Sequence, residues 1–96
     1  MRDVRESPEA QDAADEAFER WTRAEDAWEA IKWALSRDPF LGTPLTETGQ
    51  ARAFTLQGRW AWDMPTITVL YENDANYVTI KSAKFEDAQA GPAGTA

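Results

Sequence analysis

The chain has 96 residues, a length that is enough for one small domain with a single modest core, and its net charge is −7. It contains no cysteine and no histidine, so disulfides, thiolate nucleophiles, zinc–cysteine sites and histidine bases are excluded. We therefore expect no metal and no cofactor. The apolar runs are too short to span a membrane and the N-terminus is too charged for a signal peptide, which predicts a cytoplasmic protein without membrane contact.

The negative charge is concentrated in the first half of the chain. Residues 1–49 carry 12 acidic and 6 basic side chains, whereas residues 50–96 carry 5 acidic and 4 basic ones. An acidic chain is poorly suited to nucleic-acid binding as a whole. The nearly neutral second half still leaves room for a local basic site, because it holds Arg52, Arg59, Lys81 and Lys84.

The first half predicts one short strand and two helices. Residues 2–6 alternate weakly, as a short strand would. Ser7-Pro8-Glu9 is typical of a helix start, with serine as N-cap and proline at the first helical position. Thr22-Arg23-Ala24-Glu25 fits a capping box and predicts a second helix, which ends before Pro39. The apolar residues at helical spacing are Ala10, Ala14, Ala17, Phe18, Trp21, Trp28, Ile31 and Leu35.

The second half predicts three strands. Residues 40–49 indicate an ordered connection, residues 50–57 a strand and residues 58–65 a turn region. Residues 65–85 predict a β-hairpin, because apolar and polar residues alternate in both arms and residues 72–76 favour a turn. The inward-facing residues of its two arms are Ile67, Val69, Tyr71, Val78 and Ile80.

These elements predict an α+β fold in the order β-α-α-β-β-β. The last three strands form its antiparallel sheet, an αα-hairpin packs on one face, and the first strand is added at an edge. Residues 1–86 form the single domain. Residues 87–96 lose the apolar pattern and predict a disordered tail.

This arrangement resembles the RelE/ParE superfamily of small bacterial toxins from type II toxin–antitoxin systems, over residues 2–86. The resemblance begins with a charged first strand that ends in Ser7-Pro8-Glu9-Ala10. It continues with the helix end Leu35-Ser36-Arg37-Asp38-Pro39-Phe40-Leu41-Gly42, with Leu45 beyond it. Arg52, the strand Val69-Leu70-Tyr71 and the strand Tyr77-Val78-Thr79-Ile80 complete it.

The resemblance implies a toxin that is neutralised by a cognate antitoxin protein wrapped around its surface. RelE-like members cut mRNA on the ribosome, and ParE-like members inhibit DNA gyrase. The nuclease members place basic residues on the open sheet face, to hold RNA and to stabilise charge on phosphate. The ribosome with its mRNA, or gyrase, is therefore the expected target.

The nuclease interpretation assigns catalysis to Arg52, Lys81 and Tyr77, and RNA binding to Arg59 and Lys84. Arg52 and Lys81 would stabilise phosphate charge, and Tyr77 or Glu86 would act as the base. Phe85 falls where nuclease members carry an aromatic acid–base residue, and phenylalanine cannot transfer a proton.

Strand parity bears on these assignments. It places Tyr77 and Lys81 on the open face of the sheet, where a lysine usually serves only solubility. It aligns Arg52 with Phe54 and Leu56, so Arg52 has the alternative of laying its stem on the core with its head in water.

Trp60 and Trp62, beside Arg59, are predicted to bind a partner, because tryptophan and arginine dominate protein interfaces. They are equally suited to stacking nucleic-acid bases, and a turn that buries both rings is the structural alternative.

We expect a toxin component that inhibits translation by ribosome-dependent mRNA cleavage. The alternative is a non-catalytic, gyrase-inhibiting toxin or a non-toxic protein-binding relative. A third hypothesis is a small α+β interaction module unrelated to these toxins.

Overall fold

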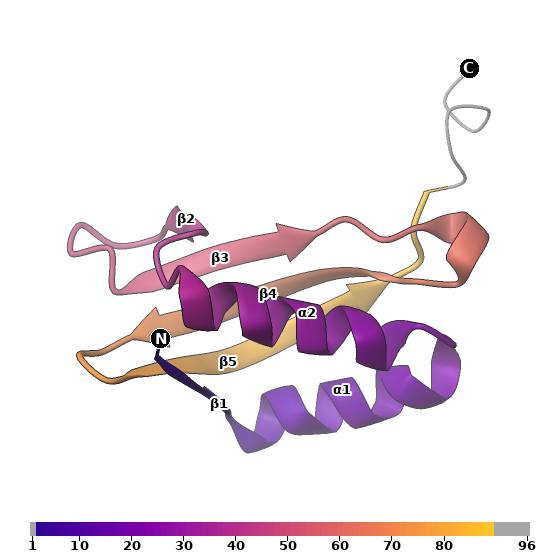
Figure 1. Ribbon diagram of the computed structural model, residues 1–96, viewed down its shortest axis with the longest axis horizontal. Coiled ribbons are helices and arrows are strands. Elements are labelled where there is room, and N and C mark those ends of the chain that lie inside the picture. The colour runs from indigo at the N-terminus through magenta and orange to yellow at the C-terminus, as the bar shows by residue number, and fades with distance from the viewer. Residues whose placement is uncertain (1, 90–96) are drawn as a thin grey trace.

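Two helices lie over one face of a five-stranded sheet in the computed structural model, which describes residues 2–89 (Figure 1). Within those residues the elements are β1 (Asp3–Glu6), α1 (Pro8–Arg20), α2 (Ala24–Arg37), β2 (Thr43–Pro44), β3 (Ala51–Leu56), the 3-10 helix η1 (Trp60–Trp62), β4 (Thr66–Asn73) and β5 (Tyr77–Glu86). The strand order is β1-β5-β4-β3-β2. The α+β class and the helical pair on one face are confirmed.

The three strands predicted to form an antiparallel sheet do so, as β3, β4 and β5, and the added strand β1 makes the whole sheet mixed. β1 takes the predicted edge position but runs parallel to β5, while the other strands pair antiparallel. Parallel neighbours need a long crossover, which the helices and the strands between β1 and β5 supply. The unpredicted strand β2 pairs Thr43 with Ala53, and two residues are too few to show an alternating pattern.

A β-bulge at Lys81 changes which side chains of β5 face the helices. Tyr71 pairs with Ile80 and Leu70 pairs with Ser82, so Lys81 has no partner on β4. A bulge of one residue shifts the alternation of every later side chain. Phe85 consequently packs toward the helices, against Trp21 and Trp28.

The two helices differ in how their N-termini are capped. Ser7 caps α1 as predicted, with its hydroxyl accepting from the Ala10 amide at 3.1 Å. The capping box predicted at Thr22 is wrong, because Arg23 occupies the N-cap position of α2 and makes no side-chain cap bond. The Thr22 amide instead donates to Asp63 Oδ2 at 2.8 Å, which ties the turn between the helices to the segment after η1.

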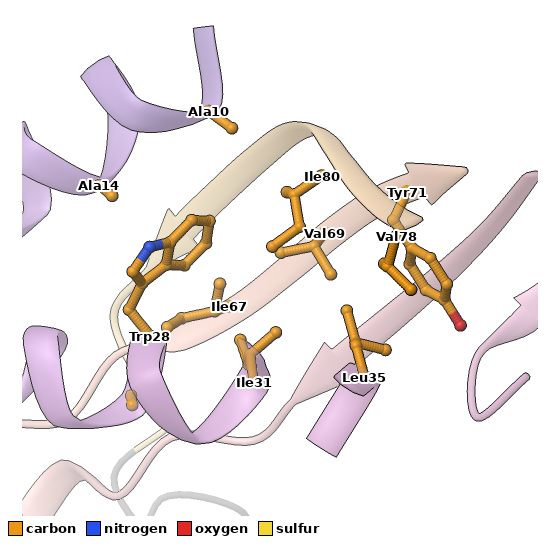
Figure 2. Close-up of a cluster of buried hydrophobic side chains, with 11 residues drawn as sticks. Ala10, Ala14, Trp28, Ile31, Leu35, Ile67, Val69, Tyr71, Val78 and Ile80 are labelled. Atoms are coloured by element: carbon orange, nitrogen blue, oxygen red, sulfur yellow. The ribbon is translucent and has the colours of Figure 1, made fainter. Parts of the chain in front are cut away.

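The core lies between the sheet and α2, with α1 along its side (Figure 2). Small residues on α1, such as Ala10 and Ala14, let that helix approach closely, while α2 contributes the large side chain of Trp28. The buried residues that form this cluster are Ala10, Ala14, Ala27, Trp28, Ile31, Leu35, Ile67, Val69, Tyr71, Val78 and Ile80. The apolar residues predicted at helical and strand spacing make up most of it.

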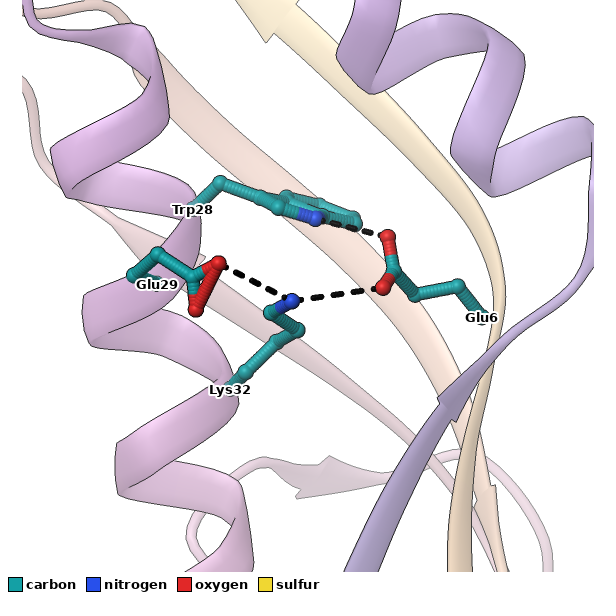
Figure 3. Close-up of polar contacts among 4 residues, drawn as sticks. All are labelled: Glu6, Trp28, Glu29 and Lys32. Carbon is teal, nitrogen blue, oxygen red and sulfur yellow. Dashed lines mark hydrogen bonds and ion pairs between the residues drawn. The ribbon is translucent and has the colours of Figure 1, made fainter.

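A polar network links β1 to α2 at the border of this core (Figure 3). The Trp28 indole N–H donates to Glu6 Oε1 at 2.8 Å, and Lys32 Nζ lies 3.3 Å from Glu6 Oε2 and 3.1 Å from Glu29 Oε1. Burial by itself would lower the pKa of Lys32, but the two carboxylates outweigh burial and raise it. The network therefore holds Lys32 charged beside the core.

Tyr71 fixes the segment after α2 from inside the core. Its buried hydroxyl donates to the Pro39 carbonyl at 3.0 Å and accepts from the Gly42 amide at 2.9 Å. Asn73 donates to the same Pro39 carbonyl at 2.8 Å. These bonds hold residues 39–42 against the sheet, although they belong to no helix or long strand.

No helix within residues 2–89 is long and apolar enough to cross a membrane. Asp87 is the first residue of the tail predicted to be disordered, residues 87–96. Its carboxylate accepts a hydrogen bond from the Trp21 indole N–H at 2.9 Å. Residues 90–96 lie outside the described part of the chain.

We expect Tyr71→Phe to lower the free energy of unfolding by about 1–3 kcal/mol, because it leaves the buried Gly42 amide without an acceptor. Urea denaturation measures the change. Tyr77→Phe is the matched control, since no hydrogen bond of its hydroxyl occurs within residues 2–89. Equal stability of the two variants would contradict the anchoring role of Tyr71.

Candidate functional site

The sheet has one face covered by the helices and one face that they leave open. The open face is the one away from the helices, and its side chains alternate with the buried residues of β4 and β5. It carries mainly small polar groups, including Thr55 and Thr68, whose hydroxyls lie 3.0 Å apart. Leu70 is the large apolar side chain exposed there.

The predicted RNA-contacting lysines lie near this open face, and each has a carboxylate close by. Lys81 Nζ is 4.0 Å from Glu72 Oε1, and Lys84 Nζ is 3.5 Å from Glu86 Oε1. All four side chains are well exposed, so these are weak, solvent-screened pairs. Glu86, the alternative base, is therefore engaged with Lys84.

Tyr77 is also on the open face, where Arg5 of β1 lies over it. The guanidinium carbon of Arg5 is 3.5 Å from the centroid of the Tyr77 ring. Such a contact is a cation–π interaction. Arg5 is thus a cation of the open face that sequence reasoning missed, because only the parallel pairing of Asp3 with Tyr77 brings β1 beside β5.

Arg52 lies on the opposite, helix-covered face of the sheet. It pairs directly with the buried Tyr71, and directly opposed residues share a face. Its Nε donates to the Gly49 carbonyl at 2.8 Å, and its Nη1 donates to the carbonyls of Gly42 at 2.8 Å and Phe40 at 3.1 Å. Its head is therefore bonded to three backbone carbonyls of the loop at residues 40–49.

Gly49 is required for this loop conformation. Its φ is +71°, a left-handed value that glycine adopts without a steric penalty. A Cβ at this position would also lie 2.9 Å from Arg52 Nη2. Arg52 and Gly49 together hold the loop closed.

The structure therefore brings Tyr77 and Lys81 to one side of the sheet and places Arg52 on the other. Phe85 is packed near Trp21 and Trp28, with ring centroids 6.4 and 5.6 Å apart. Within residues 2–89 no group of three or more acidic side chains is arranged to hold a metal ion.

The two tryptophans predicted to bind a partner are exposed, at 65% for Trp60 and 53% for Trp62. They lie on η1, in the segment that joins β3 to β4, at the end of β3 far from β2 (Figure 1). The alternative of a turn that buries both rings is therefore wrong. We call residues 58–64 the tryptophan loop.

The tryptophan loop is held by backbone hydrogen bonds at its base. The amide of Arg59 donates to the Met64 carbonyl at 2.9 Å and the Met64 amide donates back at 3.1 Å. A Cβ at Gly58 would lie 2.3 Å from the Met64 carbonyl oxygen, so only glycine fits this close approach. Both exposed rings therefore project from a braced backbone.

Asp63 joins this loop to the helices, and sequence analysis did not identify it. Its φ is 52°, in the left-handed region, where aspartate is tolerated better than most residues. Its Oδ2 accepts from the Thr22 amide and its carbonyl accepts from the Arg23 amide at 3.2 Å. The bond from Thr22 lowers the pKa of Asp63. A sequence signal that could have identified it is an aspartate, a turn-favouring residue, shortly before Pro65.

Two shallow clefts flank Trp60. One is lined by Gly58, Arg59, Trp60, Ala61, Trp62 and Gln89. The other is lined by Trp21, Trp60, Asp63, Met64, Asp87 and Ala88. Trp60 therefore forms the ridge between two hollows of the surface.

Arg59 lies beside these clefts, with its guanidinium carbon 4.8 Å from the centroid of the Trp62 ring. It forms no ion pair within residues 2–89. The tryptophan loop therefore presents two large aromatic rings and one uncompensated cation.

Comparison with protein-family models, with curated proteins and with solved structures found no match to the chain.

We expect Arg52→Met to lower the free energy of unfolding by about 2–3 kcal/mol, because hydrogen bonds from a charged group to three carbonyls are lost. Urea denaturation measures this change. The control is Lys84→Met, which removes an exposed cation and should change stability by less than about 1 kcal/mol. An Arg52→Met variant of unchanged stability would refute the structural role.

The lowered pKa of Asp63 leads us to expect that the stability of the fold depends on pH. Its folded pKa lies below the ordinary value of 3.8, so its contribution is present above pH 3.8 and is lost as pH falls through the lowered pKa. We expect the wild type to exceed Asp63→Asn in stability at neutral pH, with a gap that closes in acid. Urea denaturation between about pH 6 and about pH 2 tests this.

The exposed Glu47→Gln variant controls for general charge effects. A gap between wild type and Asp63→Asn that stays constant down to the acid end would show that Asp63 does not couple to the fold through its carboxylate.

Proposed function

We propose that the chain is a toxin-like component of a type II toxin–antitoxin pair that acts by binding a protein target, without cutting RNA. The placement of Arg52 supports this choice. A residue that would stabilise phosphate charge is instead committed to three loop carbonyls, on the face opposite Tyr77 and Lys81. The proposal takes its toxin character from the sequence resemblance and its mode of action from this geometry.

Electrostatics also favours a protein target. The chain carries −7, and the lysines nearest the open face each lie beside a carboxylate. Nucleic-acid binding draws most of its affinity from phosphate contacts by uncompensated lysine and arginine. A protein target is recognised through buried aromatic and arginine anchors, which the tryptophan loop supplies.

Pulse labelling in bacteria tests this function. On induction of the full chain, we expect DNA synthesis to fall before protein synthesis, and we expect purified chain to inhibit supercoiling by gyrase. Tyr77→Phe and Lys81→Met should leave both effects in place, because binding by the tryptophan loop does not use these groups. Growth and labelling that stay normal after induction would rule out the toxin proposal.

Cleavage of ribosome-bound mRNA is the second candidate. The observation that favours it is that Arg5, Tyr77, Lys81 and Lys84 all lie on or beside the uncovered face of the sheet. Purified chain added to programmed ribosomes distinguishes the two. Cleavage that is lost in Tyr77→Phe and retained in Trp60→Ala would establish the nuclease and overturn the binding proposal.

A further inference from the structure

The tryptophan loop has the physical character of a preformed protein-binding site. A binding surface gains affinity when its anchors are ordered before the partner arrives, because less conformational entropy is lost. Asp63 ties this loop to the turn between the helices, and the bonds between Arg59 and Met64 close its base. Trp60 and Trp62 nevertheless remain more than half exposed.

The charges around the loop define what its partner must carry. The Asp63 carboxylate accepts from the Thr22 amide, and Asp87 accepts from the Trp21 indole and lies 3.8 Å from Arg20. Arg59, in contrast, contacts the Trp62 ring and forms no ion pair with any residue from 2 to 89. Arg59 is therefore the group of this loop that can pair with a carboxylate of a partner.

The polar atoms of the rings point to the same kind of partner. In the described part of the chain, the indole N–H groups of Trp60 and Trp62 make no hydrogen bond, whereas those of Trp21 and Trp28 do. A peptide backbone offers carbonyl acceptors for these donors. The cleft lined by Trp60, Ala61 and Trp62 offers apolar walls for a side chain, whereas the cleft bordered by Asp63 and Asp87 is mainly polar.

We propose that the tryptophan loop binds a partner-protein segment that brings an apolar side chain to the cleft lined by Trp60 and Trp62 and a carboxylate to Arg59. The match between the carboxylate and the uncompensated Arg59 sets the chemistry of the segment. Single-stranded nucleic acid is disfavoured by the charge of −7, although tryptophan rings stack on bases. The inference rests on the proposed function only in taking the partner to be a protein.

The experiment uses random short peptides displayed on phage and selected against the full chain. Selected peptides are then made in soluble form, and their affinity is measured by titration calorimetry. We expect the selected sequences to combine aspartate or glutamate with leucine or an aromatic residue. We expect Trp60→Ala and Trp62→Ala each to weaken binding by about 30-fold, as loss of an interface anchor does.

Trp33→Ala is the matched control. Trp33 is also exposed, at 58%, and also has an arginine over its ring, with Arg37 4.6 Å from the centroid. It lies on α2, outside the tryptophan loop. We expect its loss to change affinity by less than about twofold, because an aromatic ring outside the interface contributes nothing to binding.

Charge reversal separates recognition from a mere structural effect. Arg59→Glu should weaken binding of the acidic peptides. Peptides in which lysine replaces the carboxylate residue should bind the Arg59→Glu variant and not the wild type. Binding to the wild type should also weaken as salt is added, because the pair lies at an exposed rim. Unfolding curves confirm that each variant is folded.

Three results would overturn the proposal. The first is that no peptide is selected, the second is that Trp33→Ala weakens binding as much as Trp60→Ala, and the third is that oligouridylate binds in place of peptides. None of these readouts depends on toxicity. Failure of peptide recognition and failure of the growth assay are therefore separate outcomes.

Discussion

Trp28 joins three parts of the fold that are distant in the sequence. Its ring, on α2, is buried in the core and lies 5.6 Å from the ring of Phe85 on β5. Its indole N–H, at the other side of the ring, donates to Glu6 on β1. A buried tryptophan needs a partner for its N–H, and here that partner also positions the edge strand. The helix, the edge strand and the hairpin therefore depend on one side chain.

The layered design has a consequence for function, because it separates the basic residues. A sheet with helices on one face sends alternate side chains either into the core region or to the open face. Arg52 is on the helix side and uses its donors to close the loop at residues 40–49. The lysines of β5 are on the other side and lie beside carboxylates. Arg52 and the lysines of β5 therefore do not meet at a single site.

The tryptophan loop shows how a fold can hold large apolar side chains in solvent. Burying two indole rings would be favourable, yet Gly58, Asp63 and the bonds at the base of the loop fix the backbone so that both rings face outward. Trp60 and Trp62 lie two residues apart and are both exposed, and adjoining apolar side chains of this kind often mark an interaction surface, whereas single ones such as Trp33 do not. The same rigidity makes Arg59 available beside Trp62.

Helical and strand periodicity was enough to identify the two helices, the four longer strands and most of the core, because it records which side chains must leave water. Ala10, Trp28, Ile31, Val69 and Ile80 were all identified from spacing, and all are buried. Only the tertiary structure decided the parallel pairing of β1 with β5, the bulge at Lys81 and the contacts of Arg52 and Asp63. Apart from the bond between Arg52 and Gly49, these features join residues about ten or more positions apart. Local patterns carry no information on which distant backbone group a side chain will meet.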